Sequence, residues 1–183
     1  FSPVLVDVLE EEEKTLDVVK TALRPFSMKS TQEKLDILSD IVKAVSAKDE
    51  RIVNTVVQYM EVTVSKLFIS TKKDLIQSYP WSQGYIVALG KSDSGIKMAY
   101  NAVSGMKGLE LLDELKGIID ESVKKLDDTI KATPIIPGDY EIICTPDITG
   151  LIAHEAFGHG VEMDMFVKNR AQAPQFIGKP VAS

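Results

Sequence analysis

The chain is poor in the residues that usually build disulfides and metal sites, because its 183 residues include one cysteine and two histidines. Cys144 alone cannot form an intrachain disulfide or a multi-cysteine zinc site within the chain. Long apolar runs and a signal-peptide pattern are also missing, so we expect no membrane-spanning helix and no membrane partner. This cysteine usage fits a reducing compartment, and we expect a cytoplasmic protein.

Positive charge is in deficit as well. Lys and Arg together number 21 against 27 Asp and Glu, which gives a net charge of -6. An acidic chain without a basic stripe interleaved with aromatic residues is a poor partner for nucleic acid or anionic lipid. We therefore expect no nucleic-acid partner. The remaining composition, 44% hydrophobic and 26% charged, is typical of a globular protein with a buried core.

The two ends suggest a part of something longer. The first residue is Phe1 and not a methionine, and residues 178–183 stop without a helix end or a polar tail. We expect the chain to be cut from a longer protein, or processed.

Two helices are expected before residue 50. Apolar residues at roughly helical spacing follow Pro3 and predict a first helix that Pro25 ends. Ser30 and Glu33 form a capping-box pattern that predicts a second helix from Ser30 to about Lys48. The apolar stripe of this second helix consists of Leu35, Leu38, Ile41, Val42 and Val45.

Residues 51–103 change character and are rich in Val, Ile, Thr and Tyr. Their short connections, including a hairpin loop at residues 92–95, predict an antiparallel meander. The expected strands cover residues 52–64, 66–70, 75–79, 83–89 and 96–103.

A long amphipathic helix is predicted over residues 111–130, with Gly117 as its weak point. A short strand at residues 140–144 and a final helix opened by Pro146 and Asp147 follow. The predicted fold class is α+β: N-terminal helices, then an antiparallel β-meander covered by a long helix.

Both histidines lie in the final helix, five positions apart, and Glu155 directly follows His154. The spacing H-E-x-x-x-H is one residue longer than the H-E-x-x-H of zinc peptidases. In a regular helix, residues five apart lie about 140° apart and about 7.5 Å along the axis, which does not suit one ion. A π-bulge would repair this geometry. Because Gly158 and Gly160 flank His159, we predict a distorted or terminated helix near residues 157–160.

Such a turn would let His154 and His159 bind a zinc ion as neutral imidazoles, with Glu155 as general base for the metal-bound water. Glu162 and Asp164 could each accept a hydrogen bond from the ring N–H of a ligand histidine, or lie on a solvated surface. The alternative interpretation of the motif is an ordinary helix with two polar histidines.

A catalytic zinc site needs a third protein ligand. Cys144 precedes His154 by ten residues, but a small buried apolar role suits it better. Asp147 is expected to be the N-cap of the last helix. We therefore expect the third ligand outside this chain.

Residues 154–164 resemble the H-E-A-x-G-H-G-x-E-x-D signature of the TldD/PmbA family, once called modulators of DNA gyrase, and a weaker similarity extends back to about Lys29. The resemblance implies a cytoplasmic zinc metallopeptidase acting on peptides or unfolded polypeptides. It implies zinc-ligand roles for His154 and His159, a base role for Glu155, and a cysteine far downstream as third ligand. The H-E-x-x-x-H motif resembles the TldD type, which implies a homodimer or a heterodimer with a PmbA-type subunit.

On this basis we predict a helix plus antiparallel-sheet domain over residues 1–132. Residues 133–183 would open an incomplete metallopeptidase catalytic domain. The alternative function is a non-catalytic module for subunit assembly or peptide binding that lacks a complete metal site.

Overall fold

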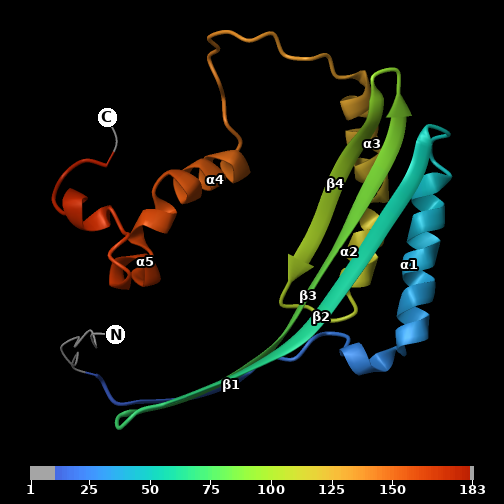
Figure 1. Cartoon of the computed structure of the whole chain (residues 1–183). Coiled ribbons are helices and arrows are strands. Elements are labelled where there is room, and N and C mark those ends of the chain that lie inside the picture. The colour runs from blue at the N-terminus through green and yellow to red at the C-terminus, as the bar shows by residue number, and fades with distance from the viewer. Residues whose placement is uncertain (1–10, 182–183) are drawn as a thin grey trace. The chain divides into compact units, whose positions relative to one another are not determined.

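The computed structural model describes residues 11–181, and its α+β content agrees with the predicted fold class (Figure 1). The chain separates into two compact units, with the division between Pro134 and Ile135. The first unit holds a four-stranded sheet with its helices, and the described residues of the second, 135–181, form short helices and no strand. Among residues 11–181, no helix combines the length and the apolar character that crossing a membrane requires.

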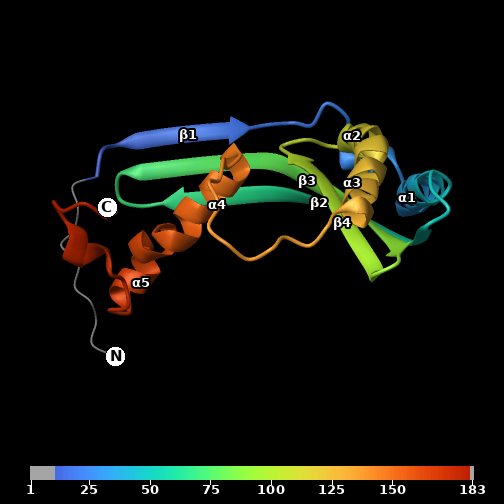
Figure 2. The same ribbon diagram turned by 90° about the horizontal axis from the view of Figure 1, so that it is seen from above.

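The sheet is organised around β3 (Lys73–Ser92), which is 20 residues long. The strand β2 (Ile52–Ile69) pairs with β3 antiparallel along one edge. The strands β1 (Lys14–Val19) and β4 (Gly95–Gly105) share the other edge, β1 parallel and β4 antiparallel (Figure 2). The predicted meander is confirmed for β2, β3 and β4, and its hairpin pairs Ser92 with Gly95, whose φ of +109° suits glycine.

The strands run further than the sequence pattern predicted. The expected breaks at Ser65 and Pro80 are absent, since both residues lie inside a strand. Pro80 lies between Ser78, the last residue of β3 that pairs with β1, and Ser82, the first that pairs with β4. Its missing N–H therefore falls on a stretch of this edge where no neighbouring strand needs a donor.

The prediction of a helix from Pro3 to Pro25 is wrong where the structure describes it, because residues 14–19 form β1; the first residues of that prediction lie outside the described part. Leu16 and Val18 alternate with Asp17, a period that a strand shares with a short piece of helix. This segment is a strand and not a helix because it pairs with β3, with Lys14 opposite Lys73 at the start of the register.

The helix α1 (Thr31–Ser46) begins as predicted. The Ser30 side chain accepts a hydrogen bond from the Glu33 N–H, and the Glu33 carboxylate accepts one from the Ser30 N–H at 2.8 Å, which completes the capping box. The predicted long helix is instead two helices, α2 (Leu111–Gly117) and α3 (Ile119–Lys131), separated at Ile118. The break follows Gly117, the position where helix propensity is lowest.

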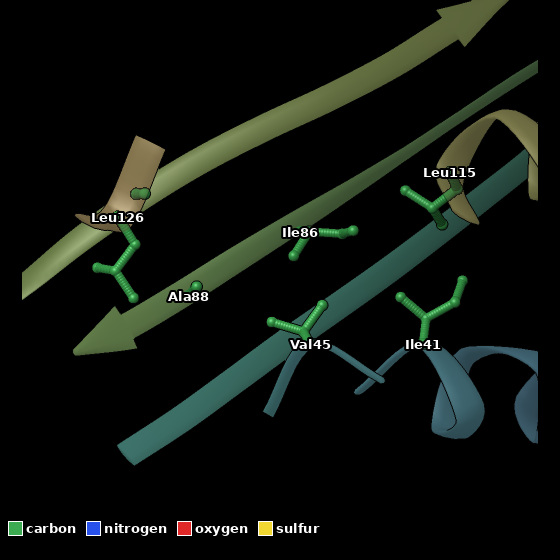
Figure 3. Close-up of a cluster of buried hydrophobic side chains, with 7 residues drawn as sticks. Ile41, Val45, Ile86, Ala88, Leu115 and Leu126 are labelled. Atoms are coloured by element: carbon green, nitrogen blue, oxygen red, sulfur yellow. The ribbon is translucent and has the colours of Figure 1, made fainter. Parts of the chain in front are cut away.

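The hydrophobic core lies between these helices and one face of the sheet (Figure 3). Gly84 and Gly90 of β3 face the helices so closely that an added Cβ would lie 2.9 Å from the side chains of Leu115 and Leu126, respectively. The small residues of β3 thus let the helices approach the sheet. The buried members of this core are Ile41, Val45, Ile86, Ala88, Ala99, Leu115 and Leu126.

The sheet continues past the helices as a three-stranded extension (Figure 1), which we call the β-arm: β1, residues 62–69 of β2 and residues 73–79 of β3. Apolar side chains are exposed on both of its faces, because neighbours in sequence point to opposite faces of a strand. The clearest examples are Leu67, 64% exposed, and Phe68, 52% exposed.

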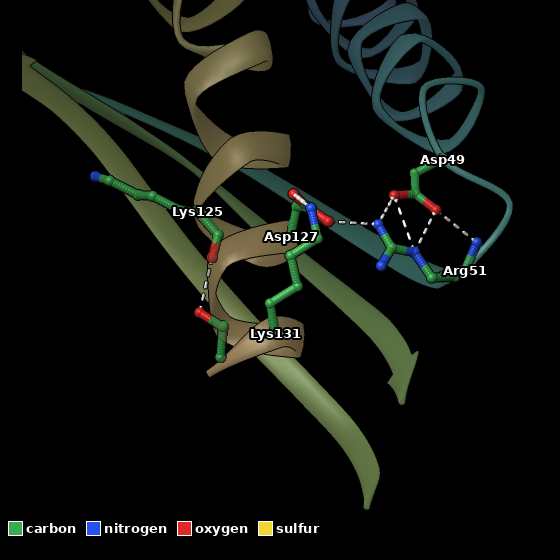
Figure 4. A network of polar contacts seen from close by, with 6 residues as sticks. Asp49, Arg51, Lys125, Asp127 and Lys131 are labelled. Atoms are coloured by element: carbon green, nitrogen blue, oxygen red, sulfur yellow. Dashed lines mark hydrogen bonds and ion pairs between the residues drawn. The ribbon is translucent and has the colours of Figure 1, made fainter. Parts of the chain in front are cut away.

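A polar network joins the start of β2 to α3 (Figure 4). The Arg51 guanidinium donates to Asp49 and, at 2.7 Å, to Asp127, which also accepts from Lys131. The hydrogen bonds from Arg51 lower the pKa of the Asp49 carboxyl to about 2. Hydrogen bonds from Lys131 and Arg51 lower the pKa of Asp127 as well.

Residues 135–181 contain α4 (Pro146–Ala156), a 3₁₀ turn η2 (Gly158–Val161), α5 (Met163–Val167) and η3 (Ala173–Phe176). The predicted strand at residues 140–144 is wrong, since these residues form no regular element and are exposed. No described residue of this unit is buried. Among residues 135–181 no strand pairs with Ile142 and Ile143, and an isolated extended segment is not stable by itself.

Candidate metal centre

The helix α4 carries the first half of the candidate site. Thr145, in extended conformation, is its N-cap, and Pro146 occupies its first turn, where a missing N–H costs nothing. The prediction of Asp147 as N-cap is wrong. Asp147 lies inside the first turn, where a negative charge interacts favourably with the helix dipole. His154 and Glu155 belong to the last turn of α4.

The helix then stops where a break was predicted. Phe157 leaves the helical region with φ -143° and ψ -25°, while its N–H still donates to the Ala153 carbonyl at 3.2 Å. The following residues tighten into η2, in which the Gly160 N–H donates to the Phe157 carbonyl at 2.9 Å. The position of His159 is therefore set by the end of α4 and the 3₁₀ turn that follows it, and not by a π-bulge.

This change of helix type brings the three motif residues together. The ligand atoms of His154, Glu155 and His159 all lie within 4.8 Å of one another. The two imidazole rings meet edge to face with centroids 4.4 Å apart, and His159 Nε2 lies 3.7 Å from Glu155 Oε2. Within residues 11–181 this is the one group of three or more such side chains that could hold a metal ion.

The donor set fits a divalent transition metal. Imidazole nitrogen and carboxylate oxygen are both ordinary zinc ligands at about 2.0–2.2 Å. The three side chains are exposed, so small rotations can bring the two imidazoles onto one ion. Two or three protein donors from one short segment leave further coordination positions open.

The two acidic residues that follow the motif behave differently from each other. Glu162 Oε1 lies 3.0 Å from His159 Nδ1, so Glu162 contacts the histidine as one of the two alternatives predicted. Asp164 instead accepts a hydrogen bond at 2.9 Å from Lys168, which lowers the pKa of the Asp164 carboxyl. Lys168 was missed in the sequence, although its i,i+4 spacing from Asp164 is a usual signal for a helical ion pair.

Cys144 is exposed and precedes α4, and it does not belong to the donor group. The structure therefore gives it neither a ligand position nor the buried apolar position expected for it. The edge-to-face contact of Phe157 with Phe176, at 6.0 Å between centroids, was also missed. No spacing signal links two aromatic residues so far apart in sequence.

No known protein-family profile matches the chain. It is similar to a metalloprotease of Methanothermobacter thermautotrophicus, with 27% identity over 163 residues, which are 87% of this chain and 36% of the relative. A metalloprotease of Synechocystis sp. is 27% identical over 152 residues, covering 80% of this chain and 31% of that protein. A metalloprotease of Methanocaldococcus jannaschii is 24% identical over 153 residues, covering 83% and 34%.

The chain spans about a third of the length of these curated relatives. All three similarities include most of this chain, and the word metalloprotease stands in the names of all three relatives. Together with the group of His154, Glu155 and His159, they support a metal-dependent protease at the level of the family.

Proposed function

We propose that the chain carries part of the catalytic centre of a zinc metallopeptidase that cleaves peptides or unfolded polypeptides. The observation that carries the proposal is the convergence of His154, Glu155 and His159 within 4.8 Å. The similarity to three proteins named metalloprotease gives this geometry a reaction class, the hydrolysis of an amide bond.

Each residue has a separate task in this proposal. His154, on α4, and His159, on η2, would hold the ion through neutral ring nitrogens. A bound zinc ion would supply Lewis-acid chemistry and a water of lowered pKa. Glu155 is directly attached to the first ligand residue and is exposed, so its carboxylate can take a proton from a water beside it and pass the proton to a leaving amine.

The proposal extends to the TldD/PmbA family and to its TldD type. It rests there on residues 154–164, whose pattern resembles the family signature. A cytoplasmic homodimer, or a heterodimer with a PmbA-type subunit, and a third ligand outside this chain belong to the same proposal.

The experiment is a zinc titration of the chain with a competing chromophoric chelator. We expect one zinc per chain, and an affinity at least ~100-fold lower in His154→Ala and in His159→Ala, since removing a ligand costs more than altering its support. Cys144→Ser is the matched control and should leave the affinity unchanged. Binding that survives both histidine substitutions would disprove the metal site.

A peptidase assay tests the role of Glu155. Glu155→Gln keeps the size of the side chain and removes the base, so the complete enzyme should lose at least ~100-fold in kcat while still binding zinc. The alternative of a non-catalytic assembly or peptide-binding module predicts that the wild-type enzyme and this variant show the same background hydrolysis.

A further inference from the structure

We propose that Glu162 is the positioning residue of His159: its carboxylate holds the Nδ1–H and thereby turns Nε2 toward the metal. The inference rests on the proposed function, because it gives one of the two proposed ligand histidines a defined tautomer. Glu162 itself would not contact the ion or the substrate.

The contact is short and local. His159 Nδ1 and Glu162 Oε1 are 3.0 Å apart, within hydrogen-bond distance. The two residues are three apart, and the Glu162 N–H donates to the His159 carbonyl at 3.4 Å, so the backbone of the turn fixes their relation. The carboxylate can only accept, so the hydrogen on this nitrogen must come from the imidazole.

The opposite ring nitrogen faces the remaining donors. His159 Nε2 lies 3.7 Å from Glu155 Oε2, beyond hydrogen-bond distance, and the ring centroid of His154 lies 4.4 Å from that of His159. In the Nδ1–H tautomer, Nε2 carries no hydrogen, and its lone pair is free to bind a metal ion. A carboxylate behind a ligand histidine also raises the basicity of the ring, and removing such a partner typically costs about 10–100-fold in metal affinity.

The chain offers a matched control two residues further on. Asp164 is also an acidic residue near the motif, but its carboxylate accepts from Lys168. A general loss of negative charge near the site would affect Glu162→Ala and Asp164→Ala alike. A positioning role affects only the first.

Two measurements test the inference. In the zinc titration, Glu162→Ala should bind about 10–100-fold more weakly. Glu162→Gln should recover most of the affinity, because its amide oxygen still accepts from Nδ1, and Asp164→Ala should match the wild type. Equal affinities for the wild type and Glu162→Ala would overturn the inference.

The second measurement needs no metal. Long-range ¹H–¹⁵N NMR of the histidine rings in the metal-free chain, with the imidazoles neutral, should show His159 as the Nδ1–H tautomer. Glu162→Ala should shift it to the Nε2–H tautomer that free histidine favours, while His154 stays as it is. If His159 is the Nε2–H tautomer already in the wild type, the inference is wrong. A wild-type chain without zinc binding would instead refute the metal site, and the tautomer would still decide the role of Glu162.

Discussion

The imidazole rings of His154 and His159 lie edge to face with centroids 4.4 Å apart, although five positions separate them in the sequence. A continuous α-helix would hold these residues about 7.5 Å apart along its axis and on different faces. The end of α4 at Ala156 and the 3₁₀ turn of Gly158–Val161 remove that separation. The metal-binding geometry therefore depends on where the helix stops.

Extending the helix should separate the histidines. The double variant Gly158→Ala/Gly160→Ala favours continuation of α4 by about 1 kcal/mol per residue, and zinc affinity should fall ~10-fold. Circular dichroism should show a gain of helix with the loss of affinity. Gly150→Ala is the control, because Gly150 lies in α4 with no atom within 4 Å of an added Cβ. Unchanged affinity in the double variant would show that the glycines do not set the turn.

Gly108 should tolerate no side chain. An added Cβ would lie 2.0 Å from the backbone oxygen of Arg24, in a close approach where the Leu109 N–H donates to that same oxygen at 2.8 Å. Gly108→Ala must displace this segment and should cost at least ~2 kcal/mol in the free energy of unfolding.

Gly117→Ala provides the comparison for Gly108. Nothing lies within 4 Å of a Cβ added to Gly117, which is helical, so this substitution should stabilise the chain by about 0.5–1 kcal/mol. Urea unfolding of both variants is the measurement. Similar free energies for the two would contradict the close approach at Gly108.

The Asp49–Arg51 pair should make stability depend on acid pH. The pKa of Asp49 is lowered from 3.8 to about 2 in the folded chain. A depressed folded-state pKa contributes stability that is present above about pH 4 and is lost as the pH falls through about 2.

Asp49→Asn should therefore lower the free energy of unfolding by roughly 1 kcal/mol at pH 7, and this difference should shrink progressively until little of it remains at pH 2. Urea titrations at pH 7, 4, 3 and 2 measure this. Asp40→Asn, which removes an exposed pair with Lys43, should change little at any pH. A constant difference between Asp49→Asn and wild type across this range would refute the assignment.

Core and β-arm should respond differently to substitution. Ile86 is fully buried, and Ile86→Ala should cost about 2–5 kcal/mol. Leu67, 64% exposed on the β-arm, should cost less than about 0.5 kcal/mol when replaced by Lys. The midpoints of thermal unfolding compare the two, and a large loss in Leu67→Lys would mean that the β-arm is covered in the native protein.

The sequence carried the local features of the fold well. Ser30 with Glu33, the hairpin at Ser92 and Gly95, and the helix break near His159 each follow from short-range chemistry, and the structure contains all three. The interpretation failed where distant residues decide. Leu16 and Val18 fit either a helix or a strand until β3 is known to lie beside them.

In the candidate site, too, the features set by neighbouring residues were predictable and the others were not. His154, Glu155 and His159 lie within six residues, and this motif, together with the glycines that flank His159, predicted a shared site. The separate behaviour of Glu162 and Asp164 could not be predicted, since it depends on the turn that orients one and on Lys168 that engages the other. Local spacing also gives no information on any ligand outside this segment.

The parallel pairing of β1 with β3 has a consequence for the order of folding. Lys14 pairs with Lys73, so this contact closes a loop of 59 residues, whereas Ile69 and Asp74 of the neighbouring hairpin are five apart. Closing the longer loop costs more chain entropy and has to wait for the edge of β3 to exist. We expect β1 to join last, and pulse-labelled hydrogen exchange during refolding should protect its amides after those of β2 and β3. Simultaneous protection would mean that the sheet forms in one step around all of its strands.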